Sequence, residues 1–122
     1  MAFIKSTSTT TAEAITVSGL SGGTNGKVVR ITTNNTAADC TYNDTVSQLN
    51  SVLFKNNDTY YGYGVVGGLT GLSAGAIYFL GSDGAPTTSA PTPSSSVRAL
   101  TIGFAINGTT LFFRPGIIIS GS

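Results

Sequence analysis

Side chains that could carry out acid–base or nucleophilic catalysis are scarce in this sequence. The chain has no histidine and only five carboxylates, at Glu13, Asp39, Asp44, Asp58 and Asp83. Without histidine there is no Ser-His-Asp triad, no Cys-His pair and no imidazole ligand for zinc. The single cysteine, Cys40, excludes an intrachain disulfide and fits the role of a small buried hydrophobic residue. These residue types favour a binding or structural protein over an enzyme, and we expect neither a metal ion nor an organic cofactor.

Two pairs of aspartates are the remaining candidates for catalysis. Asp39 with Asp44, or Asp58 with Asp83, would supply the two carboxylates that glycoside hydrolysis requires. Most of them lie beside turn residues, where aspartate side chains commonly hydrogen-bond to the nearby backbone. We therefore predict that these carboxylates stabilise turns and that the protein has no catalytic residues.

The charged residues also limit the classes of partner. Only 9% of residues are charged, against about 25% in an ordinary soluble domain. A phosphate-tracking surface needs clustered cations, whereas the six here are dispersed, at Lys5, Lys27, Arg30, Lys55, Arg98 and Arg114. No apolar run approaches the roughly 18 residues of a membrane span, and the N-terminus has no apolar signal-peptide core. We expect no nucleic-acid partner and no membrane partner.

One glycine motif has a possible chemical meaning. Residues 62–67 match the G-x-G-x-x-G pattern of dinucleotide-binding loops. That function requires a helix to follow the motif, but the next residues, Gly68-Leu69-Thr70-Gly71, open a helix poorly. The motif is thus interpreted as the glycine-rich end of a strand.

A tyrosine cluster in the same region is a candidate binding surface. Tyr60, Tyr61 and Tyr63 fall within a strand pattern, in which alternation places Tyr61 and Tyr63 on one face. Tyrosine offers a large flat surface with a polar tip, which suits sugar stacking or a protein interface. Packing at the edge of the core is the other interpretation, and it is the one favoured for the cluster. We select Tyr61 and Tyr63 as the candidates for a surface role.

The elements that would position these residues are strands. Val, Ile and Thr total 36 residues, whereas the strong helix formers total 28. We predict an all-β fold, a small antiparallel β-sandwich or barrel of about 7–9 short strands, with residues 13–122 as a single domain. The segment 44–54 allows either a short helix or a loop followed by a strand, and the second is favoured. The candidate strands are residues 13–17, 27–33, 39–42, 51–55, 59–66, 76–80, 97–106, 109–114 and 117–120.

The clearest strand pattern covers residues 97–106. Its odd positions carry mostly small residues, and its even positions carry Arg98, Leu100, Ile102, Phe104 and Ile106. Strict alternation predicts that the four apolar side chains of the even set face the core. Asn107-Gly108 follows, and this dipeptide predicts a tight hairpin turn with positive φ at both residues. Leu111 and Phe113 on the next strand are expected to face the same core.

Residues 1–12 are predicted to form a flexible N-terminal arm. The run from Ser6 to Thr11 is entirely Ser and Thr, so the arm has few apolar groups with which to order itself. Phe3 and Ile4 would insert into an apolar groove or add to a sheet edge of a partner, with Lys5 at the rim. A tail that binds nothing is the alternative.

The second half of the chain resembles a known class of virion proteins. The shared pattern is a glycine, a strand ending in Tyr-aromatic-Leu, a Gly turn, a Thr/Pro-rich loop, and a strand that passes from Val-Arg to Gly-x-Ala. Here these parts are Gly75, Tyr78-Phe79-Leu80, Asp83-Gly84, Pro86–Pro93, Val97-Arg98 and Gly103-Phe104-Ala105. The pattern, which loosely covers residues 26–119, resembles the capsid decoration (cement or head-fibre) proteins of tailed bacteriophages and related tail-fibre domains.

The resemblance implies a non-enzymatic role on the outer capsid surface of a virion. A protein of this class would be made in the host bacterial cytoplasm, form a homotrimer, bind the major capsid protein and stabilise the capsid lattice. The alternative is the receptor- or glycan-binding domain of a phage fibre. The residues expected at the capsid or subunit interface are Phe3, Ile4, Lys5, Tyr61, Tyr63 and Arg98.

Overall fold

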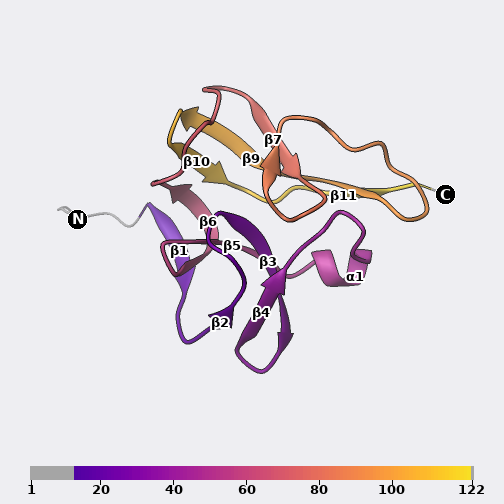
Figure 1. Ribbon diagram of the computed structural model, residues 1–122, viewed down its shortest axis with the longest axis horizontal. Helices are drawn as coiled ribbons and strands as arrows, with labels where there is room; N and C mark the ends of the chain where they lie inside the picture. Colours follow the sequence, from indigo (N-terminus) through magenta and orange to yellow (C-terminus); the bar gives the residue numbers. More distant parts are fainter. Residues whose placement is uncertain (1–12, 122) are drawn as a thin grey trace, which may run out of the picture.

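Strands dominate the computed structural model, which describes residues 13–121 (Figure 1). The all-β prediction is confirmed, with eleven strands rather than 7–9, because β2 and β8 are two-residue strands too short to show alternation. The predicted arm, with Phe3, Ile4 and Lys5, lies outside the described residues. The elements are β1 (Ala14–Val17), β2 (Ser21–Gly22), β3 (Lys27–Thr33), β4 (Thr36–Asp39), α1 (Val46–Leu49), β5 (Val52–Asn56), β6 (Thr59–Val66), β7 (Ile77–Leu80), β8 (Pro86–Thr87), β9 (Arg98–Asn107), β10 (Thr110–Phe113) and β11 (Ile118–Ser120).

One sheet contains all the strands and curls around the core. The strand order is β2-β4-β3-β5-β6-β10-β9-β7-β8, with β1 also pairing with β6 and β11 with β9. All pairs are antiparallel except β2 with β4. In Figure 1, β7, β9, β10 and β11 lie above β3, β4 and β5. The amide of Val28 on β3 donates to the carbonyl of Gly84, beyond β7, at 2.9 Å, and this contact brings distant parts of the sheet together.

Strand β6 joins the two halves of the sheet. Its first three residues, Thr59–Tyr61, pair with β5, and its last three, Gly64–Val66, pair with β10. The core lies between the halves, where Phe54 of β5 contacts Phe113 of β10 with ring centroids 5.7 Å apart. The buried residues of this core are Val28, Cys40, Leu49, Phe54, Val66, Tyr78, Leu80, Leu100, Ile102, Ala105, Leu111 and Phe113.

A β-bulge in β9 overturns half of the predicted core register. Leu100 and Ile102 are buried as expected, but Phe104 is only half-buried and Ile106 is exposed. Tyr78 lies opposite Gly103 and Phe79 lies opposite Thr101, so β9 has one more residue than β7 here. Gly103 has φ +146°, a conformation that side chains disfavour. The extra residue reverses the alternation, so Ala105 faces the core and Phe104 faces outward.

A second bulge, in β6, separates two tyrosines that were predicted to share a face. Ile15 lies opposite Tyr63, whereas the next residue of β1, Thr16, lies opposite Tyr61. The unmatched residue is Gly62. Tyr61 therefore packs against the core, and Tyr63 lies outside with 43% of its surface exposed.

The segments around α1 and the β9–β10 hairpin also differ from prediction. Residues 44–54 contain both alternatives, one helical turn and then β5, because Thr45 and Gln48 form a reciprocal capping box. The hairpin is confirmed, but Gly108 and Thr109 form its turn and neither Asn107 nor Gly108 has the predicted positive φ. The Asn107 side chain accepts a hydrogen bond from the Thr109 amide at 2.9 Å, which holds this alternative turn. The predicted strand 39–42 is wrong in its bounds, because β4 covers Thr36–Asp39 and residues 40–42 are not in a strand.

Candidate interaction surface

A continuous row of apolar side chains crosses the outer side of five neighbouring strands. Ile15 of β1 lies opposite Tyr63 of β6, and Phe104 of β9 lies opposite both Phe112 of β10 and Ile77 of β7. The Phe112 ring joins the two groups, since it contacts the Tyr63 ring edge-on at 5.3 Å and stacks on Phe104 at 5.4 Å. These five residues are called the apolar row.

Further isoleucines widen the apolar row into a larger surface. Ile106 lies two residues beyond Phe104 and is exposed, while Ile117 and Ile119 are 83% and 55% exposed. Ile117 and Ile119 line a shallow hollow of about 460 Å³ together with Ile77, Phe104 and Arg114. The apolar row with Ile106, Ile117 and Ile119 is called the outer apolar face. Because contiguous exposed apolar surface is common at interaction sites, the outer apolar face is the candidate interaction surface of this protein.

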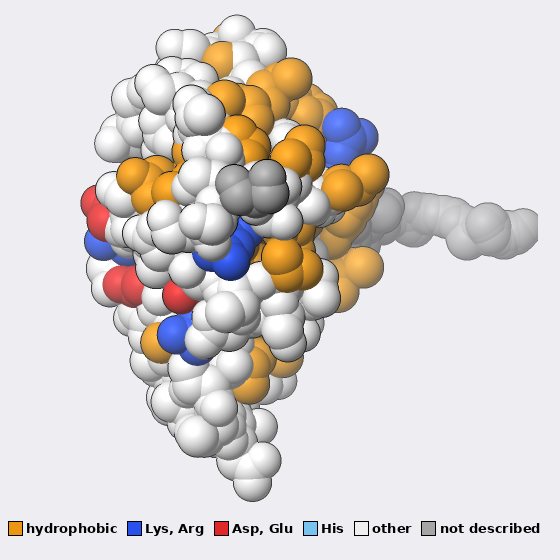
Figure 2. All heavy atoms as spheres, turned by 90° about the vertical axis from the view of Figure 1, so that its right-hand side faces the viewer, with side chains coloured by type: hydrophobic (Ala, Val, Ile, Leu, Met, Phe, Trp, Pro, Cys, Tyr) orange, Lys and Arg blue, Asp and Glu red, His pale blue; other side chains and the backbone are white. Residues whose placement is uncertain are grey.

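Figure 2 shows how the surface divides by side-chain type. Hydrophobic side chains gather toward the right-hand side of this view, whereas the acidic side chains that are visible in it lie toward the left. The outer apolar face carries one cation, Arg114, whose guanidinium lies over the Phe104 ring at 5.6 Å. This contact holds the charge against the aromatic surface.

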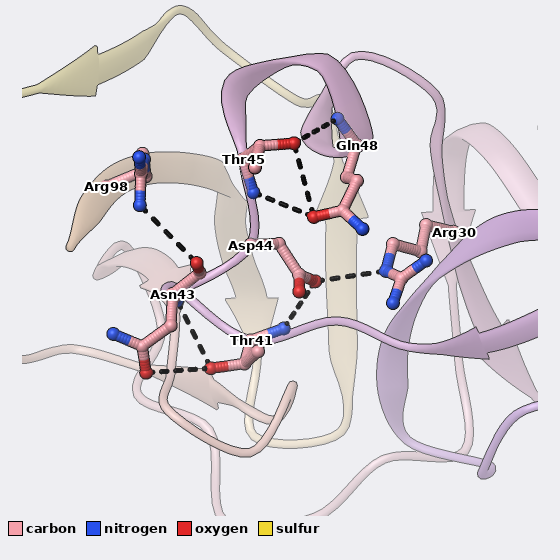
Figure 3. A network of polar contacts seen from close by, with 7 residues as sticks. All are labelled: Arg30, Thr41, Asn43, Asp44, Thr45, Gln48 and Arg98. Carbon is pink, nitrogen blue, oxygen red and sulfur yellow. Dashed lines mark hydrogen bonds and ion pairs between the residues drawn. The ribbon is translucent and has the colours of Figure 1, made fainter. Parts of the chain in front are cut away.

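Arg98, a predicted interface residue, belongs to a polar network around residues 41–48 (Figure 3). Its amide donates to the Tyr42 carbonyl at 2.8 Å, and its guanidinium donates to the Asn43 carbonyl at 3.4 Å. In the same network Arg30 pairs with Asp44 at 3.2 Å. These contacts tie the loop before α1 to β3 and β9. Of the predicted interface residues that the structure describes, only Tyr63 lies on the outer apolar face.

The aspartates considered as possible catalytic pairs each hold a turn or loop. Asp39 accepts hydrogen bonds from the amide and hydroxyl of Thr24, both at 2.7 Å. Asp58 accepts one from the Asn25 amide group at 3.2 Å. Asp83 accepts one from the amide of Ala85 and lies 3.9 Å from Lys27. Within residues 13–121, no cluster of three or more His, Cys, Asp or Glu side chains is placed to hold a metal ion.

Comparison with known proteins gives no relative of this chain. No protein-family model matches it, and no curated protein or solved structure matches it. None of the described helices is long and apolar enough to span a membrane.

Sequence alternation missed most of the outer apolar face. Strict alternation places Phe104 in the core, and it gives no reason to single out Phe112, Ile77 or Arg114. The available signal was Gly103, because an isolated glycine inside a strand pattern often marks a bulge. Continuing the alternation with the opposite phase after Gly103 places Phe104 and Ile106 outside.

Cys40 is expected to be unreactive in the folded protein. Its side chain is buried, and this burial, helped by the nearby Asp44 carboxylate, raises the pKa of the thiol from 9.0 to about 12. Since the thiolate is the nucleophile, a thiol reagent at pH 8 should label the native protein far more slowly than the urea-unfolded protein. Equal rates would contradict the burial of Cys40.

The raised pKa of Cys40 also sets a pH dependence of stability. Above pH 9 the thiol of the unfolded chain ionises while that of the folded chain stays protonated until about pH 12. The unfolded state therefore binds fewer protons, and the contribution to the free energy of unfolding falls as the pH rises through this range. In the Cys40→Ala variant, the part of the fall in the free energy of unfolding that comes from the thiol should be absent between about pH 9 and pH 12.

Proposed function

We propose that this protein is a non-enzymatic virion component that binds the outside of a bacteriophage head and stabilises the capsid lattice. The observation that supports a structural role is the outer apolar face, a group of exposed apolar side chains that spans neighbouring strands of one sheet. The resemblance of residues 26–119 to phage decoration proteins supports the location of this role on the outside of a phage head.

The proposed partners are the major capsid protein and further copies of this chain, as a homotrimer. The protein would be made in the cytoplasm of the host bacterium and act on the outer capsid surface. A lattice-bound protein needs contact area rather than titratable groups, because many linked contacts raise the effective affinity of each copy.

The alternative function is receptor or glycan binding by a phage fibre. The exposed Tyr63, edge-on to Phe112, favours this alternative, because an aromatic platform with a polar tip suits stacking against a sugar ring. In that role the protein would be present in few copies, at the end of a fibre.

Binding to phage heads tests the proposed function. Purified protein is added to emptied heads of the phage that encodes it, and bound copies are counted after sedimentation and located by electron microscopy. We expect saturable binding at many copies, distributed over the whole head. A handful of copies at one vertex would support the fibre alternative, and no binding to heads would contradict the proposal.

Deleting residues 2–8 tests the contribution of the predicted arm. The shortened protein should bind the same heads more weakly, since it lacks Phe3, Ile4 and Lys5. Undiminished binding would eliminate the arm and assign the capsid contact to the described domain.

A further inference from the structure

We propose that Asn107 is a site of spontaneous covalent modification, at which the backbone amide of Gly108 attacks the asparagine side chain and converts it into a carboxylate. The product carries a new negative charge at the tip of the β9–β10 hairpin, directly after Ile106 of the outer apolar face. The inference goes beyond the proposed function and does not depend on it, because the reaction needs only this chain and water.

The sequence contains two candidate sites for this reaction. An asparagine followed by glycine reacts most readily, because glycine has no side chain to hinder its amide nitrogen. Of the eight asparagines in the chain, two precede glycine, Asn25 and Asn107. Both residues are exposed in the structure. The contacts that each of them makes therefore decide which one reacts.

The contacts of Asn25 oppose the reaction. Its side-chain amide group donates to the Asp58 carboxylate at 3.2 Å, and its Oδ1 accepts a hydrogen bond from the Asp58 amide at 2.9 Å. The Gly26 amide, which would be the nucleophile, donates to the Lys55 carbonyl at 2.7 Å. These hydrogen bonds must be broken before the nitrogen can reach the side-chain carbon, so the folded structure protects Asn25.

The contacts of Asn107 favour the reaction. The Gly108 amide donates no hydrogen bond to another residue in 13–121, so the attacking nitrogen is free. The Asn107 Oδ1 accepts hydrogen bonds from the amide and the hydroxyl of Thr109, at 2.9 Å and 3.1 Å. Attack on the side-chain carbon places negative charge on this oxygen, and donors already directed at a developing oxyanion lower the barrier. Thr109 therefore stabilises the transition state.

The reaction has an imide intermediate. The Gly108 nitrogen loses its proton and forms a bond to the Asn107 Cγ, and the bond from Cγ to Nδ2 breaks. The leaving nitrogen takes up a proton and departs as ammonia, which leaves a cyclic imide. Water then adds to one of the imide carbonyls and breaks its bond to the ring nitrogen. The product at position 107 is an aspartate or an isoaspartate, depending on which carbonyl reacts.

The isoaspartate product changes the main chain of the hairpin turn as well as its charge. In this product the main chain runs through the side-chain carbons and is longer by one atom. The carbonyls of Gly108 and Thr109 accept hydrogen bonds from the amides of Leu72 and Leu69, at 3.1 Å and 3.0 Å. Lengthening the turn therefore disturbs the contacts between the hairpin and the loop that follows β6.

The fold does not need glycine at position 108. Gly108 has no positive φ, and a Cβ added to it would lie 3.7 Å from the Leu72 carbonyl oxygen, an ordinary van der Waals distance. Gly26, by contrast, has a φ of +85°, which favours glycine. The nucleophile at position 108 can therefore be hindered by substitution while the hairpin stays intact.

Mass spectrometry of the folded full chain after prolonged incubation at pH 8 tests the proposal. Trypsin cleaves after Lys5, Lys27 and Arg98, which releases residues 6–27 and 99–122 as separate peptides with one asparagine each. Peptide 99–122 should acquire a carboxylate at least about 10-fold faster than peptide 6–27, because hydrogen bonds protect only Asn25.

Incubation in urea is the control for the effect of the fold. In the unfolded chain the two asparagines should react at similar rates, because the protecting contacts of Asn25 are lost. Equal rates in the folded protein, or faster conversion of Asn25, would overturn the proposal. A difference between the two sites that persists unchanged in urea would also overturn it, since the fold would not be its cause.

Two substitutions test the roles of Gly108 and Thr109. Gly108→Ala should abolish detectable conversion of Asn107, because the added methyl group hinders the nitrogen, and its unfolding midpoint in urea should equal that of the wild type. Thr109→Val should slow conversion roughly five-fold, the effect of one ordinary hydrogen bond. Thr109→Ser, which keeps the hydroxyl, is the matched control and should react like the wild type. Continued conversion in Gly108→Ala, or unchanged or faster conversion in Thr109→Val, would overturn the proposed mechanism.

Discussion

Replacing Gly103 by alanine is expected to lower the free energy of unfolding by about 3 kcal/mol or more. The φ of +146° at this position suits glycine, and an added Cβ would overlap the carbonyl oxygen of Phe112 on the paired strand. That oxygen belongs to the backbone, so it cannot move aside without disturbing the β9–β10 pairing. Urea denaturation monitored by circular dichroism measures the loss.

Gly67→Ala is the matched control for this substitution. Gly67 follows β6, has no positive φ, and has open space where a Cβ would be added. Its replacement should change stability by no more than about 0.5 kcal/mol. A Gly103→Ala variant as stable as Gly67→Ala would show that β9 does not have the described bulge.

Ile102→Ala is expected to destabilise the protein by about 2–5 kcal/mol, as large-to-small substitutions in a core do. Ile102 is fully buried among Leu100, Leu111 and Phe113 in the main core. Ile106→Ala, on the same strand, should cost no more than about 0.5 kcal/mol, because Ile106 is 46% exposed. The same denaturation experiment measures both.

The contrast between these two isoleucines distinguishes the structure from simple alternation. Strict alternation places both side chains in the core and predicts comparable losses. Comparable losses would therefore indicate that the strand continues through Gly103 without a bulge. A large loss of stability in Ile102→Ala but not in Ile106→Ala would support the reversal of side-chain alternation after Gly103.

The positions of the strands could be predicted from local sequence, because β-branched residues and turn residues alternate along the chain. The limits of β3 and β6 were predicted to the residue, and eight of the nine longer strands were predicted to within one residue at each end, whereas the predicted strand 39–42 shares only Asp39 with β4. The direction of the side chains could not be predicted throughout, because a bulge depends on pairing with a distant strand. Gly62 and Gly103 reverse the alternation within β6 and β9, and only the register with β1 and β7 reveals it.

The candidate surface was less predictable than the fold. Tyr63 was selected from its residue type and does lie outside, whereas Tyr61 packs against the core. Arg98 is of a residue type that is common at surfaces. Its guanidinium donates to the carbonyl of Asn43, which lies 55 positions earlier in the chain. Such contacts depend on the closure of the whole sheet, and no local pattern encodes them.

Because β6 belongs to both halves of the sheet, it determines how the protein unfolds and how it responds to mechanical force. Neither half can separate without removing a strand from the other, because β6 pairs with β5 at one end and with β10 at the other. Local openings in one half should therefore propagate across the molecule, which favours all-or-none unfolding over stepwise loss. A pulling force applied to one half of the sheet is transmitted through the main chain and hydrogen bonds of β6 to the other half. We therefore expect the two halves to resist mechanical unfolding together.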